Sequence, residues 1–315
     1  MAHIHECPTE LLQLIFQDAC SDDPRACCSL RLVDRRISAA CVPFTHVAVS
    51  GEKRIRALLR ALKTSDPSIT TNIQRLSISD RIREEADDRF DYIMTFGSCI
   101  VDEEEDAHDE AVMERHLDEA ERLEKLVAGI LRRVAPRVTS LCILSFNPEF
   151  TGVLGCFGDL AFPLLTDLTL RFTPRTRMDG AWRAAMPDLR AFTCRFSSRS
   201  RDNASTGPRL LNSLAEGGKL TKVILPDYEP KPQSNSVVRD LCAKNGPCQL
   251  KYLEVHPVGT INVDEIFYFG HWLDKRALID LQSMSADGSM TLVVERHIED
   301  MASYDTWKKR WRSQR

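Results

Sequence analysis

The chain has 315 residues, 43% of them apolar, with a net charge of −4 and a sequence pI near 6.1. This length and apolar content allow one or two domains with a substantial core, and the charge gives no electrostatic signature of nucleic-acid binding. The longest apolar runs are too short to cross a membrane, and the first residues lack the basic and apolar regions of a secretory signal. We therefore expect neither a nucleic-acid partner nor a membrane partner.

The cysteine pattern indicates the compartment. There are eleven cysteines, an odd number, and no two of them form a CxxC pair. This pattern favours reduced thiols over a disulfide framework. The sequence therefore predicts a cytoplasmic or nuclear protein.

The N-terminal residues predict three short helices. Pro8 suits the first position of a helix, and the apolar residues after it recur on one face. Asp23 and Pro24 predict a second helix start, behind which Leu30 and Val33 fit helical spacing. Three short helices within about forty residues are too few to bury a core alone. A partner, or the rest of the chain, must complete this unit.

Residues 7–16 read Cys-Pro-Thr-Glu-Leu-Leu-Gln-Leu-Ile-Phe and resemble the first half of an F-box, Leu-Pro-x-Glu-Leu-Leu-x-x-Ile-Phe. Residues 30–37 resemble the second half less closely, because Asp34 and Ile37 stand where the family has Cys and Trp. The resemblance implies docking on the Skp-family adaptor of cullin–RING (SCF) ubiquitin ligases. It implies that five residues face this adaptor: Pro8, Leu11, Leu12, Ile15 and Leu30.

Downstream, an apolar-x-x-apolar-x-apolar template recurs. Its middle positions are Val47, Leu76, Leu141, Leu168, Phe192, Val223 and Leu253, with a weaker copy at Leu281. They are 24 to 31 residues apart, except for one gap of 65 residues. Short strands at this regular spacing, separated by helical patterns, are typical of leucine-rich-repeat-like units.

The segments between these strands predict helices. Apolar residues at helical spacing occur in residues 55–62, 117–134, 210–214 and 237–242. The long gap contains Asp102-Glu103-Glu104-Glu105-Asp106, an acidic run that predicts a mobile insertion near 98–112. The predicted fold is therefore α/β, with an F-box-like helical module at 1–46. An irregular leucine-rich-repeat-like solenoid follows at 47–315, with parallel strands on one face and helices on the other.

No arrangement of residues predicts catalysis. Phosphate-binding and nucleophile-elbow motifs do not occur in the sequence, and His116-Leu117-Asp118-Glu119 lacks the second His or Cys that a metal site requires. We therefore expect no enzyme activity, no cofactor and no metal. An enzyme whose catalytic residues meet only in the fold is the alternative that stays open.

The template also predicts a binding surface, because side chains alternate between the two faces of a strand. Arg171 and Arg195 would stand on adjacent strands about 5 Å apart, where like charges favour an acidic ligand or a nearby acid. The expected target-binding residues are Arg171, Arg195, Lys222, Tyr252, Glu254 and His256.

The resemblance and the repeats together imply a substrate-recognition subunit of an SCF-type ligase, with an unidentified target protein on the concave face of the solenoid. The alternative is a protein-interaction solenoid outside any ligase, whose N-terminal helices only cap the array. In that case, the apolar stripe of the first helix packs on its own domain.

Overall fold

The computed structural model describes residues 7–8, 11–12, 45–64, 73–81, 103–147, 149–172, 176, 178, 182–194, 206–217, 219–228, 232–242, 250–257, 279–280, 283 and 291–294. The F-box-like module expected at 1–46 therefore lies almost entirely outside the described residues. The first strand begins at His46, at the expected end of that module.

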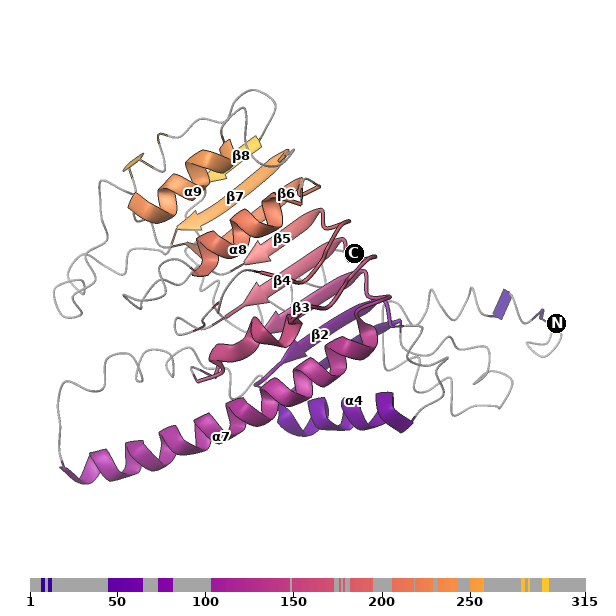
Figure 1. Ribbon diagram of the computed structural model, residues 1–315, viewed down its shortest axis with the longest axis vertical. Coiled ribbons are helices and arrows are strands. Elements are labelled where there is room, and N and C mark those ends of the chain that lie inside the picture. The colour runs from indigo at the N-terminus through magenta and orange to yellow at the C-terminus, as the bar shows by residue number, and fades with distance from the viewer. Residues whose placement is uncertain are drawn as a thin grey trace.

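In these ranges, eight strands form one parallel sheet in the order of the sequence (Figure 1). The strands are β1 (His46–Ser50), β2 (Arg75–Ser79), β3 (Ser140–Leu144), β4 (Asp167–Arg171), β5 (Ala191–Cys194), β6 (Lys222–Tyr228), β7 (Tyr252–Pro257) and β8 (Thr291–Val294). Each strand pairs with the preceding and the following strand of the chain, so the predicted α/β class with parallel strands is confirmed.

The register aligns the predicted template positions in a single row across the sheet. The aligned residues are Val47, Leu76, Leu141, Leu168, Phe192, Val223 and Leu253. Leu292 of β8 takes the eighth place, beside Leu253. The weaker copy at Leu281 was therefore the wrong choice for this place, and Leu281 itself lies outside the described residues.

A repeated backbone hydrogen-bond pattern aligns the first residues of neighbouring strands. The carbonyl of Gln74 accepts the N–H groups of Thr139 and Ser140, and the carbonyl of Thr139 accepts those of Thr166 and Asp167. The hydroxyl groups of Thr139 and Thr166 donate to the same two carbonyls. Because buried backbone groups need partners, this pattern holds successive strands at one level.

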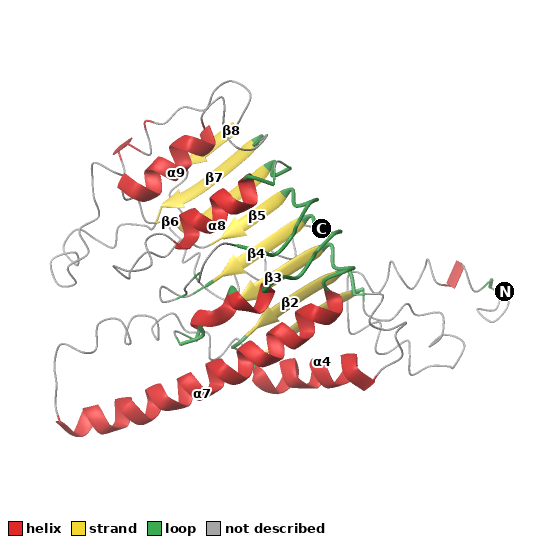
Figure 2. Cartoon of the chain, viewed as in Figure 1, coloured by secondary structure: helices red, strands yellow, loops and turns green. Residues whose placement is uncertain are grey.

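In the described part of the chain, the helices lie on one face of the sheet (Figure 2). They are α4 (Glu52–Thr64), α7 (Glu103–Val134), α8 (Thr206–Ala215) and α9 (Pro232–Cys242), with short 3₁₀ turns η3 (Thr151–Val153) and η4 (Gly155–Phe157) beside α7. Apolar residues of these helices pack on the template rows of the strands and form one continuous core. The helices predicted from the apolar periodicity are thus confirmed in kind and place.

The acidic insertion is partly helical, contrary to the prediction. Helix α7 begins at Glu103 and not near Leu117, so the residues from 103 onwards continue the helix outwards beyond the sheet (Figure 1). Glutamate is a good helix former, and acidic residues in the first turns interact favourably with the helix dipole. The prediction of a mobile insertion considered only the repulsion between the acidic side chains and omitted both of these effects.

Candidate functional site

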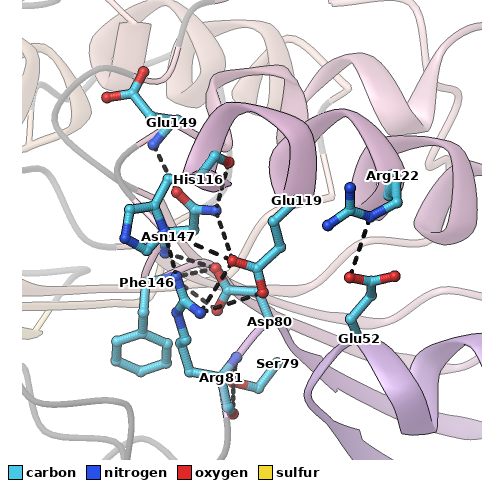
Figure 3. Close-up of polar contacts among 10 residues, drawn as sticks. All are labelled: Glu52, Ser79, Asp80, Arg81, His116, Glu119, Arg122, Phe146, Asn147 and Glu149. Carbon is cyan, nitrogen blue, oxygen red and sulfur yellow. Dashed lines mark hydrogen bonds and ion pairs between the residues drawn. The ribbon is translucent and has the colours of Figure 1, made fainter. Parts of the chain in front are cut away.

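Polar residues gather where β2 and β3 end, beneath the middle of α7 (Figure 3). Asp80 and Arg81 follow β2, Asn147 comes shortly after β3, and His116 and Glu119 lie on α7. We call these five residues the Asp80 cluster. Because parallel strands end at the same edge of a sheet, Asp80 and Asn147 meet there although 67 positions separate them.

Asp80 is 3% exposed, and its carboxylate accepts hydrogen bonds from two backbone N–H groups. The N–H of Phe146 lies 2.9 Å from each carboxylate oxygen, and the N–H of Asn147 lies 2.6 Å from Oδ2. Burial raises the pKa of Asp80 to about 6, although these N–H groups and the guanidinium groups of Arg81 and Arg171 act to lower it. The loop after β3 is therefore held by a carboxyl group from the neighbouring strand.

Arg81 joins the sheet edge to α7. Its Nη1 donates to Glu119 Oε1 at 3.2 Å, and its Nη2 donates to His116 Nδ1 at 3.0 Å. Burial and the nearby Arg81 lower the pKa of His116, against the opposing effect of Glu119. A guanidinium group can only donate, so Nδ1 of His116 accepts and the imidazole is neutral.

Asn147 makes the second link to α7. Its Nδ2 donates to the backbone carbonyl of His116 at 3.1 Å and to Glu119 Oε2 at 3.4 Å. Its Oδ1 accepts the N–H of Glu149 at 2.9 Å. One buried amide thus holds both the helix and its own loop (Figure 3).

The Asp80 cluster contains a carboxyl group and an imidazole, the groups that general acid–base catalysts use. Here the carboxyl group accepts backbone hydrogen bonds, and the imidazole accepts one from Arg81. These contacts attach α7 to the sheet, so the geometry supports a structural role. The sequence interpretation of residues 116–119 addressed only metal binding. The signal that could have identified Asp80 is an acidic residue placed directly after a predicted buried strand.

Arg171, an expected target-binding residue, is completely buried. Its Nη1 donates to the carbonyl of Ser145 at 2.5 Å, and its guanidinium carbon lies 3.9 Å from the centre of the Phe146 ring. The prediction of a target contact at Arg171 is therefore wrong. The carbonyl, the aromatic ring and the nearby Asp80 carboxyl group supply the favourable contacts that a buried arginine requires.

The middle of the sheet face opposite the helices is buried as well. Cys142, Thr169, Thr193 and Ile224 occupy matching places on this face, and each is at most 5% exposed. The expected open concave surface is therefore not continuous across the sheet. All five residues of β3 are buried, as is common where both faces of a parallel sheet are covered.

Four of the expected target-binding residues do come together, on β6 and β7. The Lys222 Nζ lies 5.2 Å from the centre of the Tyr252 ring, and the Tyr252 hydroxyl donates to Glu254 Oε2 at 3.0 Å. Glu254 also forms a short hydrogen bond with His256 Nε2. We call Lys222, Tyr252, Glu254 and His256 the β6–β7 cluster. Lys222 is exposed, Tyr252 and Glu254 are half-buried, and His256 is buried; Arg195 lies outside the described residues.

The expected adaptor-binding residues divide between surface and interior. The N–H of Leu12 donates to the carbonyl of Pro8 at 3.1 Å, which is a helical turn. Pro8 and Leu11 are exposed, whereas Leu12 is only 2% exposed. The burial of Leu12 argues against a contact of this residue with a partner, and its expected role stays a prediction. Ile15 and Leu30 lie outside the described residues.

Among the described residues, no group of His, Cys, Asp and Glu side chains is placed to hold a metal ion. In the same ranges, no helix is both long enough and apolar enough to span a bilayer. In comparisons with known proteins, no family model, no curated protein and no solved structure matches the chain.

Proposed function

We propose that this chain is a non-enzymatic substrate receptor of an SCF-type ubiquitin ligase, working in the cytoplasm, the nucleus or both. Residues 1–46 would bind a Skp-family adaptor as an F-box does, and an irregular leucine-rich-repeat-like solenoid would hold a target protein. The partners would supply catalysis, and this chain would supply proximity and orientation.

The observation that carries the proposal is the exposed pair at the start of the F-box-like motif. Pro8 is exposed and Leu11 is 50% exposed, in the helical turn that the motif requires. Residues three positions apart share one face of a helical turn, so Pro8 and Leu11 supply two apolar side chains that a partner can contact. The sequential, in-register pairing of the strands supports the solenoid part of the proposal.

The β6–β7 cluster is the part of the expected target surface that we retain. It combines an aromatic ring with a lysine and a carboxylate, and Tyr252 and Glu254 are half-buried whereas the middle of the same sheet face is fully buried. Aromatic residues flanked by charged groups are common at protein-binding hot spots. We exclude Arg171 from this surface because its side chain is buried.

Affinity purification of the tagged chain from cells, read by mass spectrometry, tests both halves at once. We expect a Skp-family adaptor and a target to co-purify with the wild-type chain. Pro8→Ala with Leu11→Ala should remove the adaptor and keep the target, because only the motif surface changes. Lys222→Ala with Tyr252→Ala should remove the target and keep the adaptor.

The matched control changes the same residue types outside the motif. Pro163 and Leu164 are both exposed, and Leu164 is 49% exposed, close to the value for Leu11. Pro163→Ala with Leu164→Ala should leave both partners bound. A wild-type chain that is folded by circular dichroism and recovers no adaptor would rule out the ligase role.

One observation favours the alternative, a protein-interaction solenoid capped by its N-terminal helices. Leu12 is 2% exposed, which is what a helix packed on its own domain would show. A cap protects the end of an array, so deleting residues 1–43 should then lower the urea midpoint of the whole chain. A docking module should instead leave the remaining residues folded with a similar midpoint.

A further inference from the structure

Helices α4 and α7 lie side by side on the sheet, and two contacts define their register. The Arg122 Nε lies 3.4 Å from Glu52 Oε2. A Cβ atom on Gly129 would lie 3.2 Å from a methyl carbon of Leu59. In both pairs, the α7 residue lies 70 positions after the α4 residue. The two helices are therefore parallel with a constant register, which places Lys63 level with Arg133.

Exposed cations line this junction on both helices. Arg56, Arg60 and Lys63 lie three and four residues apart on the α4 face that includes Glu52, and Arg122, Arg132 and Arg133 lie on the α7 face that includes Gly129. We call Arg56, Arg60, Lys63, Arg122, Arg132 and Arg133 the basic seam. All six are exposed.

Among the described residues, the acidic groups at the seam do not balance these cations. Glu52 lies at one end and forms ion pairs with Arg56 and Arg122. Residues 56–64 and 125–138 contain no aspartate or glutamate at all. Cations placed close together repel one another unless an anion lies among them.

Helix dipoles explain only part of this pattern. Lys63, Arg132 and Arg133 occupy the last turns of their helices, where cations are favourable, and Arg133 donates to the carbonyl of Gly129 at 2.8 Å. Arg56, Arg60 and Arg122 lie further from the helix ends, where the dipole effect has faded. Arg56 and Arg122 share the single carboxylate of Glu52, so the described part of the seam keeps an excess of positive charge that attracts anions from solution.

The length of the seam sets the class of anion. From Arg122 to Arg133, which is level with Lys63, the helix rises about 16 Å, and this length matches an extended peptide of about five residues. Beyond Arg122, towards the start of α7, the exposed side chains include Asp118 and Glu121. A nucleic-acid backbone continuing along α7 would meet these acids, whereas a short acidic peptide would end before them.

We propose that the basic seam docks a short acidic segment of a partner protein. The surface lies on the helical side of the sheet, away from the face that carries the β6–β7 cluster. The proposal does not depend on a ligase role, since it rests only on the charges and register of α4 and α7.

Fluorescence anisotropy on the full chain tests the proposal with a labelled oligo-glutamate peptide as the probe. The seam variant is Arg60→Gln with Lys63→Gln and Arg132→Gln, which removes three exposed charges. The control is Arg190→Gln with Lys219→Gln and Lys251→Gln, three exposed cations elsewhere on the chain. Circular dichroism checks both folds, and Arg60→Lys with Lys63→Arg serves as a charge-preserving variant.

We expect the wild-type chain to bind the peptide at low salt and to release it as salt rises, because exposed charges are screened. The seam variant should bind roughly tenfold or more weakly, and the control and the charge-preserving variant within about twofold of wild type. Equal losses in both triple variants, or no binding at low salt, would overturn the proposal. So would tighter binding of an oligonucleotide of matched charge, or salt-dependent self-association of the chain.

Discussion

At the scale of single residues, Asp80 illustrates how a buried carboxyl group can organise a loop. It accepts the N–H groups of Phe146 and Asn147 from a segment that follows a different strand. Without Asp80 these two buried donors would lose their acceptor, at a cost of about 1–3 kcal/mol for each unpaired group. Asp80→Ala should therefore lower the free energy of unfolding by about 2–4 kcal/mol. Urea denaturation measures this change. A loss below about 1 kcal/mol would show that the loop keeps its conformation without the hydrogen bonds to Asp80.

The raised pKa of Asp80 gives stability an unusual pH dependence. Between the ordinary value of 3.8 and about 6, the folded chain holds a proton at Asp80 that the unfolded chain has released. The free energy of unfolding should thus fall as pH rises through this window, by up to about 3 kcal/mol. Asp80→Asn should remove this contribution, so the difference in the free energy of unfolding between wild type and variant should change with pH. A difference that stays constant from pH 4 to about 7 would contradict a raised pKa of Asp80.

Residue roles were the part of the site least accessible from the sequence. The alternation rule correctly grouped Lys222, Tyr252 and Glu254, because these residues follow from strand periodicity alone. It failed for Arg171, since burial depends on what covers the sheet face and periodicity carries no such information. Asp80 was missed because its partners lie 66 and 67 positions further along the chain.

At the scale of elements, the close approach of α4 to α7 depends on a residue without a side chain. Gly129 is buried, and the branched end of Leu59 fills the space above it. The apolar periodicity predicted both helices but not their contact, because glycine contributes nothing to an apolar stripe. The start of α7 was missed for a different reason, since helix propensity outweighed charge repulsion in the acidic turns.

Substitutions at Gly129 measure this contact. Gly129→Ala gains about 1 kcal/mol of helix propensity but presses on a flexible leucine end, so the net change should be within about 1 kcal/mol. Gly129→Leu overfills the junction and should destabilise by about 1–3 kcal/mol. Ala61→Leu, on the exposed face of α4, is the control and should be nearly neutral. Urea midpoints compare the three, and a neutral Gly129→Leu would show that the helices are not in close contact.

At the scale of the whole molecule, the sheet was the feature best predicted from the sequence. The middle and last apolar positions of successive templates became aligned rows, because a period-two strand pattern with one buried face favours one register. The final strand was misplaced because Leu281 lies 28 residues after Leu253, within the expected spacing, whereas the residue that pairs with Leu253 is Leu292, 39 residues after it. Only pairing with β7 decides between them.

We have proposed that the exposed start of the F-box-like motif binds a Skp-family adaptor. Size-exclusion chromatography with light scattering, on the purified full chain mixed with a purified Skp-family adaptor, tests it most directly. We predict a one-to-one complex that Leu11→Asp abolishes and that Leu164→Asp, at an equally exposed leucine, leaves intact. Separate elution of the two proteins at their individual masses, with the chain folded, would contradict the claim.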